Sequence, residues 1–373
     1  MNKSIRVILA LATALIAALA VTVASAQDTG DVVRTFYYIA ADANGVQQIF
    51  QHNIGGDEQA RQVTFAGEDI ITYGAAYDGL SIAYVSGGQL WLQPIHSDDA
   101  EALAPLSAEQ FFSGPIYSQD GDYIAYADNG IHLVELATRE TRLILADVPL
   151  NSDGTNMGEM RLYTPDQFVR GADGREDKLI VKVGIWEWQT AGILDLSSGA
   201  LSVLEPQIHT RALAIYGGKV LLYGNGGIAG EMSLELVEGY ENLNDYTKVV
   251  SFADITFDSL FAEQAIEIHP GTVRIFGTAL VTPMERSYAF FFDADLMNGT
   301  VSNYTLLPLT EDTTINVTAG EMSPDGAIVP LYVNAMYTDS GTIYGQVILI
   351  DLAGGGVLNI QFPETVSVLR WQP

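Results

Sequence analysis

Carboxylates spaced as in a calcium-binding loop are the first residues of this sequence that could do chemistry. The segment Asp293-Ala294-Asp295-Leu296-Met297-Asn298-Gly299 places oxygen-bearing side chains at alternating positions. A helix-flanked calcium loop needs its glycine at position 6 and a glutamate at position 12. Here the glycine is the seventh residue and no glutamate follows at the twelfth. We therefore interpret the segment as a hairpin bend, and residues 151–156 as a weaker case of the same kind.

Histidines and nucleophiles give no recognised catalytic pattern. No His-Glu-x-x-His or Gly-x-Ser-x-Gly motif is present, which disfavours a zinc peptidase and a serine hydrolase. The chain has no cysteine, so disulfides, thiolate metal sites and a cysteine nucleophile are excluded. We expect structural or solvated roles for the five scattered histidines, which are His52, His96, His132, His209 and His269. We assign no catalytic, cofactor-binding or metal-ligating residue, and no cofactor.

Two features could instead bind a ligand. Trp186 and Trp188 alternate on one expected strand and so face the same side, either as a platform for sugar or peptide or as packing between sheets. We favour packing. The segment 147–177 is a long departure from the surrounding pattern, rich in polar residues, and we expect an insertion there that could carry a specific ligand.

The charge of the chain limits its partners. There are 46 acidic and 17 basic residues among 373, a formal net charge of −29. Nucleic-acid binding is disfavoured because phosphate neutralisation needs clustered Lys and Arg. The acidic field favours basic partners or divalent cations, or it serves solubility alone. Because 48% of the residues are hydrophobic, the chain has ample material for a folded core.

The first 26 residues have the pattern of a secretory signal peptide. Lys3 and Arg6 precede an apolar run from Val7 to Val23, and Ala24-Ser25-Ala26 gives a small-x-small cleavage site. We expect cleavage after Ala26, although an uncleaved anchor is the alternative. The expected domains are thus a signal peptide at 1–26 and one domain at 27–373. The protein would be extracytoplasmic (periplasmic, secreted or on the cell surface), with no membrane span after cleavage.

Repeated hairpins follow. An apolar run, an acidic or turn residue, a glycine-containing bend and a second apolar run recur at 131–145, 192–204, 290–309 and 347–362. A second unit precedes several of these hairpins, with an Asp-Gly turn that leads into an alternating strand. It is seen at Tyr77-Asp78-Gly79, Ser118-Gln119-Asp120-Gly121 and Ser323-Pro324-Asp325-Gly326. We expect the carboxylates of these turns to bond backbone N–H groups of their own bend.

The spacing of the repeats predicts an all-β propeller of four-stranded blades. The repeat length of 41 to 55 residues is close to that of four-stranded propeller blades. We count seven blades, with six or eight as alternatives. The first blade shows only three strands, at 34–41, 47–54 and 61–65. We therefore expect 366–371 to supply its innermost strand and to close the ring.

Residues 45–92 resemble the TolB-like repeat, also called the PD40 or WD40-like β-propeller repeat. The resemblance rests on Gly45-Val46-Gln47-Gln48-Ile49-Phe50, Gly55-Gly56, Arg61-Gln62-Val63-Thr64, Tyr77-Asp78-Gly79 and Ile82-Ala83-Tyr84. Ser323-Pro324-Asp325-Gly326 repeats the turn. The resemblance implies a propeller, which in this family serves as a periplasmic scaffold, a surface-binding protein or part of a peptidase.

We expect a non-catalytic binding or scaffolding module. Its partner would be a protein or glycan on the loop face of the propeller, with a basic partner as one option, and the chain would be a monomer. The alternative is a stand-alone propeller enzyme, a polysaccharide lyase or glycosidase. Such an enzyme would bring two or three acids together in the central channel beside a His, Tyr or Arg.

Overall fold

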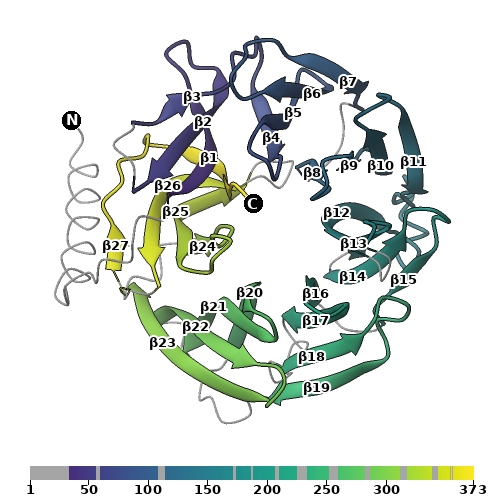
Figure 1. Cartoon of the computed structure of the whole chain (residues 1–373), viewed down its shortest axis with the longest axis vertical. Helices are drawn as coiled ribbons and strands as arrows, with labels where there is room; N and C mark the ends of the chain where they lie inside the picture. Colours follow the sequence, from purple (N-terminus) through teal and green to yellow (C-terminus); the bar gives the residue numbers. More distant parts are fainter. Residues whose placement is uncertain are drawn as a thin grey trace.

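The computed structural model describes residues 33–55, 59–107, 114–170, 174–185, 188–205, 210–224, 233–251, 259–281, 286–310, 317–337, 343–352, 354 and 356–373. The regular elements in these residues are β-strands in antiparallel sheets, set as blades around a common centre (Figure 1). The predicted all-β propeller is therefore confirmed. The described residues contain no helix with the length and hydropathy needed to cross a bilayer.

Five sheets have four strands each, and within each sheet the strands follow one another in chain order from one edge to the other. Their strands are β4 (Ile70–Ala75), β5 (Ser81–Ser86), β6 (Gln89–Pro94) and β7 (Glu101–Pro105); β8 (Ile116–Tyr117), β9 (Tyr123–Ala127), β10 (Gly130–Glu135) and β11 (Thr141–Ala146); β12 (Leu162–Val169), β13 (Lys178–Ile185), β14 (Trp188–Asp195) and β15 (Leu201–Val203); β16 (Thr210–Ile215), β17 (Lys219–Gly224), β18 (Ser233–Glu238) and β19 (Tyr246–Ser251); and β20 (Ser259–His269), β21 (Thr272–Val281), β22 (Arg286–Asp295) and β23 (Thr300–Thr310).

The two ends of the chain meet in a sixth sheet. It contains β1 (Arg34–Ala41), β2 (Gln47–Ile54), β3 (Arg61–Gln62), β24 (Val317–Ala319), β25 (Ile328–Tyr337), β26 (Ile343–Asp351), β27 (Gly356–Leu358) and β28 (Val366–Trp371). The last strand, β28, pairs antiparallel with β1, which confirms the predicted closure. Two further pairs link β28 to β26. Because this sheet is continuous, the count of seven blades stays a prediction.

The hydrophobic core is divided into layers between consecutive sheets. Apolar side chains of β1 and β2, such as Tyr37 and Ile49, pack against Tyr73 and Ile82 of the next sheet. The other clusters join neighbouring sheets in the same way. A blade therefore buries both of its faces. This explains why many strands carry apolar residues at consecutive positions and not only at every second one.

The predicted hairpins are confirmed as the third and fourth strands of their sheets. The strand predicted at 61–65 is shorter, because only Arg61 and Gln62 pair with β2. Of the segment 147–177, residues 162–169 form β12 and pair with β13. The part between β11 and β12 is a loop whose base is closed by paired backbone groups of Val148 and Arg161.

Candidate functional site at the inner ends of the blades

The Asp-Gly turns that join the first two strands of a blade share one geometry. In each of the three turns the glycine N–H donates to the carbonyl three residues earlier, and the glycine lies in the left-handed region. The carboxylates of Asp78, Asp120 and Asp325 accept backbone N–H groups at 2.8, 3.1 and 3.1 Å, two residues further on. The predicted role of these carboxylates is confirmed. They stabilise the bend rather than face a ligand.

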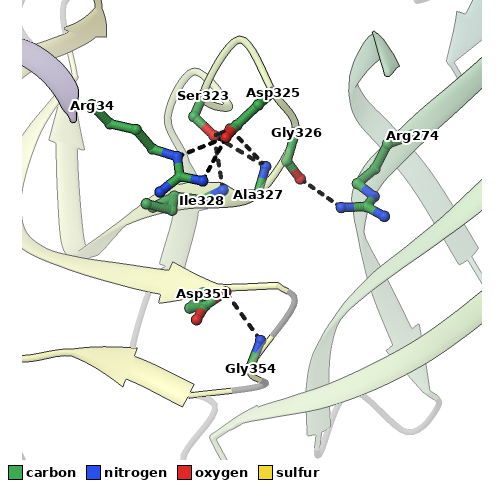
Figure 2. Close-up of polar contacts among 9 residues, drawn as sticks. All are labelled: Arg34, Arg274, Ser323, Asp325, Gly326, Ala327, Ile328, Asp351 and Gly354. Carbon is green, nitrogen blue, oxygen red and sulfur yellow. Dashed lines mark hydrogen bonds and ion pairs between the residues drawn. The ribbon is translucent and has the colours of Figure 1, made fainter. Parts of the chain in front are cut away.

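Strand residues on either side also bind to the turn at Ser323–Gly326, as Figure 2 shows. Arg34 binds the Asp325 carboxylate at 2.7 Å from one side, and Arg274 donates to the Gly326 carbonyl at 2.9 Å from the other. Ser323 Oγ accepts the N–H of Ile328 within the bend. Contacts of this kind hold the inner ends of adjacent blades in fixed relative positions.

Charged side chains from distant parts of the chain meet at Glu321, just after β24. The Glu321 residue is exposed to solvent, yet protein surrounds its carboxyl closely enough to raise its pKa through desolvation. The charges of Arg370 and Lys182 oppose this rise, and that of Asp166 adds to it. Lys182 on β13 also pairs with Asp166 on β12 at 2.5 Å. We call Glu321, Arg370, Lys182, Asp166 and Tyr77 the central polar cluster.

Arg370 on β28 is held in place by its surroundings. Its backbone N–H donates to the Tyr73 hydroxyl at 3.1 Å, and its guanidinium lies over the Tyr73 ring, 5.9 Å from the centroid. Gly114 leaves the space for this arrangement, because a Cβ there would stand 2.4 Å from Nη2 of Arg370. The indole N–H of Trp371 donates to the Glu321 carbonyl at 2.7 Å. These contacts hold the Arg370 guanidinium and the Glu321 backbone in place.

Tyr77 brings a phenol to the same place. It lies in the β4–β5 turn, is 37% exposed and hydrogen-bonds the side chain of Gln119 in the next blade. Burial raises its pKa most, and the negative charges of Glu176 and Glu321 raise it further. The phenol therefore lies within electrostatic reach of two carboxyl groups that come from different sheets.

The central polar cluster offers hydrogen-bond donors and acceptors of both charges. β4, β8, β12, β16, β20 and β24 lie around the centre of the ring in Figure 1, and the chain ends there. Arg370 and Lys182 can bind carboxylates or carbonyls, Glu321 can bind ammonium or guanidinium groups, and Tyr77 can pack on a ligand ring. Glu321 can also hold a proton above the usual range for a carboxyl.

The residues considered from the sequence lie elsewhere. Asp295 accepts the N–H groups of Met297 and Asn298, so its carboxylate serves the hairpin bend. The Asp293 carboxylate is instead bound by Arg274 of the neighbouring strand β21. His132 stacks on Tyr126 and bonds a backbone carbonyl. Among the described residues no three His, Asp or Glu side chains form a group fit for a metal. His209, Trp186 and the side chain of Trp188 lie outside the described residues, as does the segment 1–26.

The sequence did not single out the members of the central polar cluster as functional residues. Glu321 and Leu369 lie at equivalent positions of two repeat units, near their innermost strands. A charged residue at such a position, or next to it, is the signal that could have found Glu321 and Arg370. Inner strands otherwise carry mainly apolar and small residues. Charged side chains there must face either the ring centre or an ion partner.

Comparison with known proteins supports the fold. Neither a family model nor a curated protein matches the chain. Prolyl oligopeptidase B from Galerina marginata is similar, with a TM-score of 0.51 and 10% identity over 85% of this chain and 46% of that one. TolB from Acinetobacter baumannii has a TM-score of 0.44 and 14% identity, over 75% of this chain and 64% of that one.

An oligogalacturonate lyase in complex with manganese is also similar, with a TM-score of 0.46 and 12% identity over 91% and 97% of the two chains. This chain thus spans less than two thirds of the length of the TolB protein and less than half of the peptidase. Identities this low show the fold alone.

Proposed function

We propose that the chain is an extracytoplasmic, non-catalytic propeller that binds a protein or another polar ligand at the central polar cluster. One observation carries the proposal: Glu321 is open to solvent while Arg370, Lys182 and Asp166 act on its carboxyl. Charges that served the fold alone would be satisfied by fixed partners inside it. The net charge of −29 favours a ligand that carries basic groups, which would bind Glu321.

The proposed location rests on the sequence. Residues 1–26 have the charge, apolar length and small residues of a cleavable signal, and the absence of cysteine suits an exported chain that needs no disulfides. The mature protein would act as a monomer, since the propeller closes its own sheet. Sequencing of the mature N-terminus tests the cleavage, which is expected to leave Gln27 first.

Affinity capture with point variants tests the binding site. The purified mature chain is used as bait in the extracytoplasmic fraction of the cells that make it, beside Glu321→Gln, Arg370→Gln and the control Glu364→Gln. Glu364 is exposed and precedes β28. A ligand of the central cluster is expected to lose about tenfold or more in affinity with Glu321→Gln or Arg370→Gln, the value of one charge-assisted hydrogen bond. Equal capture by all four proteins would overturn the proposal.

A polysaccharide lyase or glycosidase is the second candidate, and Tyr77 favours it. Its phenol lies within electrostatic reach of the Glu176 and Glu321 carboxyl groups, a combination that could move a proton to or from a sugar. The test is release of unsaturated or reducing sugars from a panel of acidic and neutral polysaccharides. Turnover that is lost in Tyr77→Phe and in Glu321→Gln would establish the enzyme and refute the non-catalytic proposal.

A further inference from the structure

A buried carboxyl joins two neighbouring blades beside the central polar cluster. Glu176 precedes β13, and its residue is only 6% exposed. One of its oxygens, Oε2, accepts the backbone N–H of Asp120 at 3.2 Å, from the β8–β9 turn of the preceding blade. The other oxygen, Oε1, is buried and has no hydrogen-bond partner among the described residues. A buried polar atom without a partner is costly and calls for an explanation.

A proton on Glu176 removes most of this cost. An ionised carboxylate buried without a bonded cation is far less stable than a neutral acid in the same place. Glu176 has no ion pair in the described part of the chain, whereas other buried or half-buried acids such as Asp293 do. The geometry therefore favours the protonated side chain, which can still accept the Asp120 N–H.

The charges around Glu176 come from three elements. The Asp120 carboxylate in the β8–β9 turn opposes its ionisation, and Arg170, which follows β12, favours it. Tyr77 in the β4–β5 turn is uncharged in the neutral range. Desolvation is the largest influence, and the net result is a pKa of Glu176 above its usual value. Asp120 itself stays ionised, because hydrogen bonds from Ser118 and the Asp122 N–H outweigh its own desolvation and lower its pKa.

We propose that Glu176 and Asp120 form a proton-dependent joint between the β8–β9 turn and the segment that leads into β13. With a proton on Glu176 the β8–β9 turn and the segment that leads into β13 stay in contact. When Glu176 ionises, it faces the Asp120 carboxylate across the same contact, with an oxygen that no donor satisfies, and the joint loosens. Because Gln119 next to Asp120 bonds Tyr77, the opening would move one wall of the central polar cluster.

The sign of the pH dependence follows from the two states. In the unfolded chain Glu176 titrates near 4.5, and in the folded chain at a higher pH. Between these two values the folded protein holds the extra proton, so this group makes stability fall as pH rises. Below the window and above it, Glu176 adds no slope. Lowering the pH through this window closes the joint.

Thermal unfolding of Glu176→Gln tests the proposal, because glutamine keeps the shape and stays neutral. We expect the Tm of the variant minus the Tm of the wild type to increase as the pH is raised from about 4 to about 8. The increase should be about 2 °C or more for each tenfold gain in the proton affinity of Glu176 on folding. The control Glu140→Gln, at an exposed residue of the β10–β11 turn, should keep a constant difference. A Glu176→Gln difference that does not change with pH would overturn the joint.

Two measurements on the wild-type chain remain decisive if the variant folds poorly. A carboxyl-carbon NMR titration should give Glu176 a pKa above the usual value of a glutamate, and a pKa at or below that value would refute the proposal. Hydrogen exchange of residues 118–123, corrected for its intrinsic pH dependence, should show less protection above the Glu176 transition than below it. Unchanged protection across that transition would exclude loosening of the joint.

Discussion

At the scale of single residues, the buried ion pair of Arg274 and Asp293 joins local and long-range structure. The Arg274 Nε and Nη2 atoms donate to the two oxygens of Asp293 at 2.6 and 2.8 Å, and Nη1 donates to the Gly326 carbonyl of the next sheet. Asn303 donates to the same carboxylate at 2.7 Å. A guanidinium has the planar shape to make all these bonds, whereas a lysine has not. The Asp293 carboxylate in the segment that looks like a calcium loop therefore binds side-chain donors from β21 and β23.

Replacing Asp293 by Ala should destabilise the protein strongly, because it leaves Arg274 buried without a counter-charge. We expect a loss of about 3–5 kcal/mol in the free energy of unfolding, measured in urea. The control is Glu101→Ala, which removes the exposed partner of Arg139 and should change the free energy of unfolding far less. Similar losses for the two variants would contradict the role given to the buried pair.

Gly114 offers a second test at this scale. A methyl group there would lie 2.4 Å from Arg370 Nη2 and 2.6 Å from the Tyr73 carbonyl. Gly114→Ala should therefore cost about 1–3 kcal/mol and displace the Arg370 side chain. Gly67→Ala, where a Cβ meets nothing within 4 Å, serves as control. Chemical denaturation measures the cost, and an unchanged midpoint in Gly114→Ala would show that Arg370 is not held there.

At the scale of elements, β23 differs from the other outer strands. Those strands are two or three residues long, as β3, β15 and β27 are, or carry a charged residue, as β7, β11 and β19 do. β23 has eleven residues and none is charged, while Val301, Tyr304 and Leu306 are 37–40% exposed. Short length and charge are the usual protections of a sheet edge against pairing with another chain. Bulges interrupt the pairing of β23 with β22 but do not shorten the strand.

A lysine at Tyr304 should therefore suppress aggregation on heating. We expect Tyr304→Lys to raise the onset temperature of light scattering without a matching rise in Tm. Tyr246→Lys is the matched control, since Tyr246 is 38% exposed on β19, a strand that already has Lys248. An equal effect of both lysines would point to net charge rather than to the β23 edge.

Local elements were predictable where turn chemistry and alternation coincide. The turns at Asp78, Asp120 and Asp325 follow from Asp-Gly and its neighbours, and the strand at 366–371 follows from a missing repeat. The shortening of the strand at 61–65 did not follow, because it depends on pairing with β2 rather than on its own residues.

At the scale of the molecule, the site depends on ring closure. Asp166 lies on β12, Glu321 follows β24 and Arg370 lies on β28. The charge of Arg370 reaches Glu321 only when β28 has taken its place beside β1. Reasoning from spacing treats each repeat alone, so it predicted the ring but not which side chains would meet at its centre. The Glu176–Asp120 contact was hidden for the same reason.

Deleting residues 366–373 should open the ring and destabilise every blade. The strand buries Val366, Leu369 and Trp371 against β1 and β26, and these contacts would be lost together. We expect low soluble yield and rapid proteolysis, with recovery when a peptide of the same residues is added. Deleting Pro373 alone is the control. A truncated chain as resistant to protease as the full chain would show that closure does not support the fold.

Because β1 pairs with β2 on one edge and with β28 on the other, the order of events in folding is constrained. A chain that emerges from a ribosome or a translocation pore N-terminus first exposes one edge of β1 until its last residues arrive. Pairing of Phe36 with Trp371 then joins nearly opposite ends of the sequence, and contacts so distant form late and slowly. The intact ring is therefore a product of the completed chain, and a pore would meet only open intermediates, which are easier to unfold than the closed protein.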